Sequence, residues 1–430
     1  MSARIATIRA RQVWDSRARP TVEAEVHLEN GAIGRGIAPA GASRGAHEAI
    51  DLRDGGERFA GFGVDTAVNA IRDEVAPALS GMDARDQAAI DRTLHDVDGQ
   101  PQFARIGGNA AVAVSLAVLD AGAKHERLPT WRYLAGDTHP RIPMPEIQIF
   151  GGGAHAARRT DLQDFMVMAP HAGSFRRALE ITADIYHAAG RLMEAAGTRS
   201  GFADEGGWWP AFDSNEHALD TLVRAIEQAG YRPGEDVWIS LDIAANELGD
   251  GNGYRLGLDA RALSPAEMGD LVLGWAARYP ILSIEDPAGQ DDWVTVASVT
   301  RAIGDRVQIV GDDVLVTSAA RVADAVAQST CNAALIKVNQ AGTVSDTLAA
   351  LAVARAAGWA TLVSARSGET EDVAIAHLAV GWDAGQFKVG SMARGERTAK
   401  WNEMLRIEEA MGSHAVYAGW GALPRGIAAR

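Results

Sequence analysis

The sequence predicts an α/β barrel preceded by a smaller α+β domain. In the second part of the chain, apolar runs lead to polar side chains. Five successive polar ends, at positions 242, 285, 312, 337 and 366, lie 43, 27, 25 and 29 residues apart. A strand, a helix and their loops need about 25–30 residues, so this spacing indicates successive βα units. The first 135 residues instead show strand-like and then helical segments, which is typical of an α+β domain. The apolar runs are 237–241, 281–284, 307–311, 333–336, 360–364 and 386–390.

An antiparallel meander is expected near the N-terminus. Apolar and polar residues alternate from Ile5 to about Ile37, and Asn30-Gly31 is a strong hairpin signal. The stretch 38–48 that follows carries glycines and small residues, which leave its backbone free to move and to approach a ligand closely. An ordinary surface loop would look the same, so both interpretations stay open.

Helices are expected to complete the first domain. The pattern over 64–124 is helical, and the run 110–123, rich in alanine, valine and leucine, would be buried on most sides. The segment 136–140 marks a break. Because 430 residues are too many for one small core, we expect a capping domain over 1–135 and a barrel domain over 141–430.

The barrel is expected to open with a second glycine-rich loop. Residues 150–155 follow a short apolar strand, residues 161–168 alternate as a strand should, and a helix is predicted over 174–196. The turn 200–210 then places Glu205 between paired glycines and bulky indoles. That setting can raise the pKa of a carboxyl group and suit it to act as a general acid. A solvated loop carboxylate is the alternative.

Three acids and a lysine stand at consecutive strand ends. Asp242, Glu285, Asp312 and Lys337 should therefore meet at the C-terminal mouth of the barrel. A single aspartate after a strand is usually a turn residue or a helix N-cap, but four ionisable ends in register are costly to bury without a counter-ion or a task. Three carboxylates without cysteine or histidine suit a hard, oxygen-preferring cation such as Mg²⁺.

These groups suit removal of a proton next to a carboxylate. A metal on the three acids would clamp a substrate carboxylate and stabilise the charge that forms when the adjacent proton leaves. Lys337 would take that proton if cationic neighbours lower its pKa, and Glu205 would protonate a leaving hydroxyl from the opposite side. The predicted reaction class is β-elimination from a carboxylate.

Further residues should bind an anionic group. Arg366 with Ser367 forms a fork for phosphate or carboxylate, and Lys400 adds a second anion contact. The loop at Ser43 could close over the site and exclude water.

Composition limits the partners. The formal net charge of −15 argues against nucleic acid or an anionic membrane as the main partner, but it does not exclude a small anionic substrate. The sequence has no run of about 18 apolar residues and no apolar run of a signal peptide. The single cysteine, Cys331, excludes a disulfide framework, so we expect a reducing, cytoplasmic compartment.

Several motifs occur in a fixed order along the chain. They are Trp14-Asp15-Ser16-Arg17 followed by Pro20-Thr21-Val22-Glu23, Asp204-Glu205-Gly206-Gly207, Ser283 to Pro287, Gly311-Asp312-Asp313, Lys337-Val338-Asn339-Gln340, Arg366 to Asp372, and Arg406-Ile407-Glu408-Glu409. Together they resemble the enolase family, and the resemblance covers nearly the whole chain. It implies a small N-terminal α+β domain that caps an enolase-type α/β barrel, whose second strand runs against the others.

The resemblance also implies an activity and its cofactors. It makes Lys337 the base and Glu205 the acid of a dehydration such as that of 2-phosphoglycerate to phosphoenolpyruvate. It implies two Mg²⁺ ions per site, the second bound with substrate, and a homodimer or ring of dimers in which Glu23 pairs with Arg406 across the interface. By resemblance, Asp242, Glu285 and Asp312 hold the first ion and Ser43 the second, while His155, Arg366 and Ser367 contact phosphate, and Gln163 and Lys400 surround the substrate carboxylate.

Some positions depart from the family pattern. Ala365 stands where the family has histidine, and Asp164 stands where it has glutamate. Arg44, Arg158 and Arg159 replace uncharged residues on two loops. We therefore expect a roomier and more cationic pocket, with these residues among its ligand contacts, that suits a larger or more anionic ligand.

Three functions are compatible with these residues. The favoured one is a diverged Mg²⁺-dependent enolase-family enzyme that acts on 2-phosphoglycerate or a close analogue to form an enol phosphate or phosphonate ester. Enolase-like proteins of phosphonate antibiotic pathways, implicated in forming carboxyphosphonoenolpyruvate, are a fitting class. The alternatives are an ordinary glycolytic enolase and an inactive scaffold with a binding role. The intact metal triad, Lys337 and Glu205 argue against the inactive scaffold.

Overall fold

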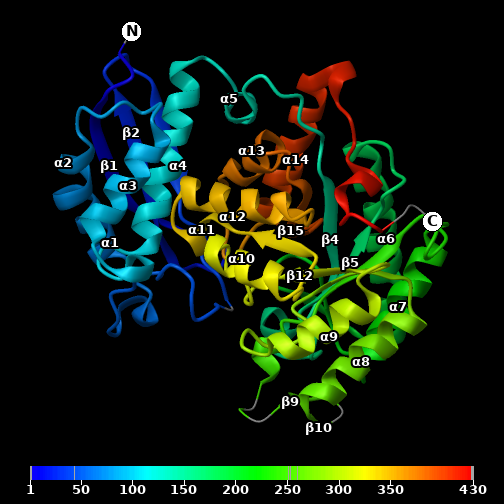
Figure 1. Ribbon diagram of the computed structural model, residues 1–430. Helices are drawn as coiled ribbons and strands as arrows, with labels where there is room; N and C mark the ends of the chain where they lie inside the picture. Colours follow the sequence, from blue (N-terminus) through cyan, green and yellow to red (C-terminus); the bar gives the residue numbers. More distant parts are fainter. Residues whose placement is uncertain (1, 43, 250, 252, 259, 428–430) are drawn as a thin grey trace.

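In the part of the chain that the structure describes, the N-terminal region is a three-stranded antiparallel sheet covered by helices (Figure 1). This computed structural model describes all residues except 1, 43, 250, 252, 259 and 428–430. Strands β1 (Ile5–Trp14), β2 (Pro20–Leu28) and β3 (Ile33–Ile37) pair in sequence order, which confirms the predicted meander. The helices are α1 (Asp65–Ala70), α2 (Ala76–Leu79), α3 (Gln87–Asp98), α4 (Gly108–His125) and α5 (Thr130–Ala135), with a π-helical turn over Ile71–Val75.

Helix α4 connects this region to the barrel. It packs on β2 and β3, and it also contacts helices α11 (Val338–Ala341) and α12 (Val344–Ala356) of the barrel. Its alanine-, valine- and leucine-rich run is buried on almost every side, as the sequence predicted. Strand β3 approaches α4 so closely that a Cβ atom on Gly36 would lie 2.5 Å from the carbonyl oxygen of Ala113.

Among the described residues, eight strands close into a barrel in the order β4, β5, β8, β11, β12, β13, β14, β15 and back to β4. Neighbouring strands are parallel except that β5 is antiparallel to both β4 and β8. This topology confirms the enolase-type barrel and its reversed second strand. The strands are β4 (Met144–Gly151), β5 (Asp164–Met168), β8 (Trp238–Asp242), β11 (Ile281–Glu285), β12 (Gln308–Gly311), β13 (Ala333–Ile336), β14 (Ala360–Ser364) and β15 (Gly385–Ser391).

Helices cover the outside of the barrel (Figure 1). The predicted helix over 174–196 is α6 (Phe175–Ala196), which Ser174 caps by accepting a hydrogen bond from the N–H of Arg177. Within the described residues, none of the helices combines the length and apolarity needed to cross a membrane. The remaining helices are α7 (Asn215–Gln228), α8 (Pro265–Arg278), α9 (Trp293–Ile303), α10 (Ala319–Ala327), α13 (Ala374–Gly381) and α14 (Gly395–Met411), and two small hairpins pair β6 (Arg199–Phe202) with β7 (Trp208–Pro210) and β9 (Tyr254–Leu256) with β10 (Arg261–Leu263).

A polar layer crosses the barrel interior one step below its mouth. Ser240 Oγ donates to Glu146 Oε2 at 2.8 Å, and Gln308 Nε2 donates to Ser283 Oγ at 2.9 Å and to Gln386 Oε1 at 3.1 Å. Burial raises the pKa of Glu146 to about 7. The interior is therefore filled by hydrogen-bonded side chains, and the free space lies at the mouth.

Replacing Gly36 by alanine should destabilise the protein, because the added methyl group would collide with the Ala113 carbonyl oxygen on α4. We expect the free energy of unfolding to fall by about 1–3 kcal/mol, measured by guanidinium unfolding followed by circular dichroism. Gly274→Ala in α8 is the control, since no described atom lies within 4 Å of its added Cβ. Equal unfolding midpoints for the two variants would contradict the close approach of β3 to α4.

Candidate active site

The barrel mouth collects acidic side chains from neighbouring strands. Asp242, the last residue of β8, is in register with Glu285 on β11 and with Asp164 on β5. Because β5 runs in the opposite direction, its first residue rather than its last lies at this rim. Asp312 and Lys337 directly follow β12 and β13. The strand ends singled out in the sequence are thus neighbours in space.

Lysine side chains lie between these acids. Lys388 Nζ is 2.8 Å from Asp242 Oδ2 and 2.7 Å from Glu285 Oε2. Lys337 Nζ is 2.6 Å from Asp312 Oδ2. All five side chains are largely buried, so the ion pairs are poorly screened by water. Sequence reasoning missed Lys388, although its charge within the apolar run 386–390 was a usable signal.

The pairing shifts the pKa values of these groups. Burial alone would raise the pKa of Asp242, but the Lys388 ammonium lowers it. Burial and then Asp242 raise the pKa of Glu285 well above its usual range. Burial lowers the pKa of Lys337, and the cationic neighbours Arg366 and Lys388 lower it as expected. Asp312 and Glu285 outweigh these effects, so the net shift of this pKa is upward.

The acids at the rim could hold a divalent metal ion. Within the described residues, Glu285 Oε1 and Gln163 Oε1 are buried without a hydrogen-bond partner, and Gln163 Nε2 donates to Asp242 Oδ2 at 3.1 Å. Unpaired buried oxygens beside carboxylates are the hard donors that Mg²⁺ prefers. In a second acidic group, Asp286 accepts the backbone N–H groups of Asp312 and Asp313 at 2.9 and 2.8 Å, which braces the loop after β12.

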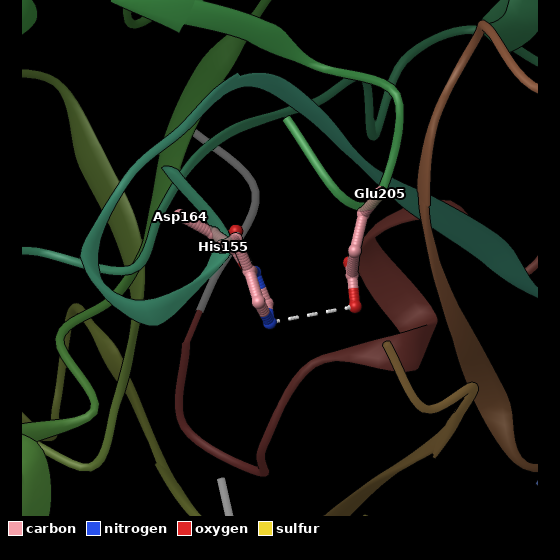
Figure 2. Close-up of side chains that lie close together, drawn as sticks. All are labelled: His155, Asp164 and Glu205. Carbon is pink, nitrogen blue, oxygen red and sulfur yellow. Dashed lines mark hydrogen bonds and ion pairs between the residues drawn. The ribbon is translucent and has the colours of Figure 1, made fainter. Parts of the chain in front are cut away.

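A histidine and two acids form a cluster across the mouth. Figure 2 shows His155 directed at Glu205, with Nε2 3.8 Å from Glu205 Oε1 and Nδ1 3.2 Å from Asp164 Oδ1. Burial alone would lower the pKa of His155, but Glu205 and Asp164 raise it to about 9. Glu205 also lies 3.9 Å from the guanidinium of Arg397. Trp208, one of the two indoles that follow Glu205 in the sequence, stacks on Tyr186, with 4.7 Å between the ring centroids.

The predicted anion fork lies against the loop 38–48. Arg366 Nη1 is 2.7 Å from Glu48 Oε2, and Ser367 Oγ accepts the N–H of Ala42 at 2.6 Å and Nη1 of Arg17 at 3.2 Å. Both fork residues are buried. Ser43, the proposed ligand of a second metal ion, lies outside the described residues. Sequence reasoning also missed Glu48, which ends the glycine-containing stretch.

These groups surround one small cavity of about 20 Å³. It is lined by Gly41, Ala42, His155, Gln163, Asp164, Glu205, Asp242, Lys337, Ser364, Ala365, Arg366, Ser367, Lys388, Val389 and Gly390.

Comparison with known proteins identifies the family. A sequence model of the enolase N-terminal domain matches residues 5–134, and one of the enolase C-terminal TIM barrel domain matches residues 139–424. The chain belongs to the enolase family. It is 46% identical over 417 residues to Enolase 1 of Desulfitobacterium hafniense strain Y51, covering 96% of this chain and 95% of that protein. It is therefore an enolase-family enzyme, a lyase similar to phosphopyruvate hydratase.

The extra arginines do not line the cavity of this enolase-family site. Arg158 pairs with Glu247 at 2.9 Å, Arg44 lies 3.7 Å from Asp51, and Arg159 is exposed. Ala365 does line the cavity, beside Arg366 and Ser367. The three arginines therefore add no positive charge to the described cavity wall, and a roomier pocket at Ala365 stays a prediction.

The predicted position of Lys400 needs correction as well. This lysine is fully buried on α14, where Nζ donates to the Thr370 carbonyl oxygen at 2.7 Å and pairs with Glu369 at 3.0 Å. It braces the loop after β14 from behind and is not among the described cavity-lining residues. Lys388, by contrast, lines the cavity.

His155 should titrate near pH 9, because Asp164 and Glu205 stabilise its imidazolium form. Its charged form therefore adds stability that is fully present below its ordinary pKa of about 6.5 and is lost as the pH rises towards 9. Nitrogen NMR of the imidazole rings checks the midpoint, with His155→Gln for assignment. His377 is the internal control, since burial lowers its pKa. A His155 midpoint below pH 7 would contradict the cluster.

Proposed function

We propose that this enolase-family enzyme removes water from 2-phosphoglycerate, or from a close analogue, to form an enol phosphate. The supporting observation is the position of Lys337 relative to the cluster of His155, Asp164 and Glu205. Strand β13, which precedes Lys337, stands four strands from β5 in the closed order, so these groups face each other across the mouth. A base on one side and a proton donor on the other suit elimination of a proton and a hydroxyl group.

Each side chain then has one task. Lys337 takes the proton next to the substrate carboxylate, and Glu205, supported by His155, protonates the leaving hydroxyl. Arg366 and Ser367 bind the phosphate, and Gln163 and Lys388 lie beside the substrate carboxylate. The residues proposed to hold two Mg²⁺ ions are Asp242, Glu285 and Asp312 for the first and Ser43 for the second.

Mg²⁺ bound by these residues would supply positive charge for the substrate carboxylate and would neutralise the acids around Lys337. Of the acids near Lys337, Asp312 raises its pKa most, ahead of Glu285. If Asp312 bound a metal ion instead of pairing with Lys337, the ammonium group of Lys337 would lose this stabilising contact and would release a proton more readily. Metal binding and activation of the base would therefore depend on the same carboxylate.

A second candidate is an analogue that carries a phosphonate. The observation in its favour is Ala365, a methyl group in the cavity wall beside Arg366 and Ser367, where the family has histidine. Against it, Arg44 and Arg158 pair with Asp51 and Glu247 and do not line the cavity.

With Mg²⁺ and 2-phosphoglycerate, the natural protein should form the enol product with a kcat of about 10 s⁻¹ or more, followed by its ultraviolet absorbance. EDTA should abolish the rate, and Lys337→Met should lower it about 10²–10⁴-fold, because the base is lost. If the natural protein is one to three decades slower and Ala365→His restores the rate, the phosphonate candidate is favoured. No turnover by either protein would reject the proposal.

We also propose a homodimer or a ring of dimers. Glu23 pairs with Arg11 within its own chain, whereas Arg406 is exposed and, among the described residues, pairs with its near neighbour Glu403 at 2.8 Å. Arg406 is thus accessible to an acid of a second copy. Sedimentation velocity at micromolar concentration should show a species of at least twice 45.4 kDa. Arg406→Ala should weaken the assembly, and Arg176→Ala on the exposed start of α6 is the control. A monomer alone would reject the proposal.

A further inference from the structure

Gln148 is a fully buried side chain on β4 to which the proposed mechanism assigns no task. Its Nε2 donates to Asp164 Oδ1, and its Oε1 accepts the backbone N–H of Gly207 at 2.8 Å. Gln148 therefore joins the rim acid of β5 to the turn that carries Glu205. It is not among the described residues that line the cavity.

These hydrogen bonds close a ring of contacts around the proposed proton donor. From Gln148 the ring passes to Asp164, from Asp164 to His155 Nδ1 at 3.2 Å, and from His155 Nε2 to Glu205 Oε1 at 3.8 Å. The backbone then runs two residues from Glu205 to Gly207, whose N–H returns to Gln148. Figure 2 shows the part of this ring made by His155, Asp164 and Glu205. A displacement of Gln148 would move both ends of the cluster.

Close backbone packing holds the Gln148 amide in one place. A Cβ atom on Gly207 would collide with its Oε1, and one on Gly151 would lie 3.3 Å from both amide atoms. The backbone carbonyl oxygen of Gln148 also accepts a hydrogen bond from Ser391 Oγ at 2.6 Å, which holds this part of β4 in place. The amide therefore has little room to rotate.

We infer that Gln148 is a positioning residue for the proton-donating side of the reaction. An amide can donate to a carboxylate and accept from a backbone N–H at the same time, which neither a carboxylate nor a thioether of similar length can do. Through these two bonds Gln148 sets the distance of Glu205 and His155 from the leaving hydroxyl. It has no contact with the base side at Lys337 among the described residues. The inference rests on the proposed function, because it concerns the second half of a dehydration.

The two halves of the reaction can be measured separately. Exchange of the substrate proton with deuterated water needs Lys337 but no proton donor, whereas enol formation needs both. Gln148→Met keeps the side-chain size and removes both hydrogen bonds. We expect enol formation to fall about 10–100-fold, while proton exchange stays within about threefold of the natural rate. Equal losses in both rates, or no loss in either, would overturn the inference.

Two further variants sharpen the test. Gln148→Glu keeps an acceptor for the Gly207 N–H but loses the donor to Asp164. Like Gln148→Met, it should lower the rate of enol formation and leave proton exchange nearly unchanged. Gln386→Met is the matched control, because Gln386 is an equally buried glutamine that bonds Gln308 and the Ala422 carbonyl oxygen in the layer below. This control should leave the ratio of the two rates unchanged.

A readout without substrate separates this inference from the proposed function. Failure of the natural protein both to exchange and to dehydrate 2-phosphoglycerate would reject the function. The imidazole nitrogen resonances of His155 still report the ring in that case. They should shift in Gln148→Met and stay unchanged in Gln386→Met. Identical His155 resonances in the natural protein and in Gln148→Met would reject the positioning role.

Discussion

The balance of buried charge at the barrel mouth is the constraint on which the rest of this site depends. Asp242, Glu285 and Asp312 are all buried at one rim, where carboxylates cannot remain charged without counter-charges. In this structure Lys337 and Lys388 provide them at 2.6–2.8 Å. Under the proposed function, a divalent cation bound to these acids would draw Asp312 away from Lys337 and change the protonation of the proposed base. Metal affinity and the readiness of the base would then depend on the same contacts.

The reversed strand β5 explains why the proposed proton-donating side of the site is built differently from the other strand ends. The other strand ends receive their side chains from regular βα units, but β5 brings its first residue, Asp164, to the mouth. The loop between β4 and β5 carries His155 to the same place, and the turn between β6 and β7, which lies beside β4, carries Glu205 there. These three groups do not belong to one βα unit. In the inference above, a side chain from the neighbouring strand β4 holds them together. Gln148 has the two hydrogen bonds required.

The surface arginines show that a residue on a loop beside the mouth need not point into the cavity. Arg44 and Arg158 lie on the two loops that border the mouth, yet each turns to a nearby acid, Asp51 or Glu247. A flexible, exposed side chain is placed by local ion pairs worth little energy, and sequence spacing cannot predict its direction. The same limit applies to Lys400, whose place in the sequence does not reveal that its side chain on α14 points to the Thr370 carbonyl oxygen behind the loop and not into the cavity.

The sequence by itself determined the barrel, its strand ends and the three acids with Lys337, because the period of βα units and the polar ends of apolar runs are local patterns. The same applies to the N-terminal meander and to α6, whose capping serine precedes it. Only the tertiary structure decided that Lys388 rather than Lys400 enters the mouth, that Asp312 raises the pKa of Lys337, and that Gln148 and Glu48 hold functional groups in place. These features depend on contacts between segments as much as 318 residues apart, as for Glu48 and Arg366. Such distances and directions arise only when the barrel closes and brings separate strands side by side.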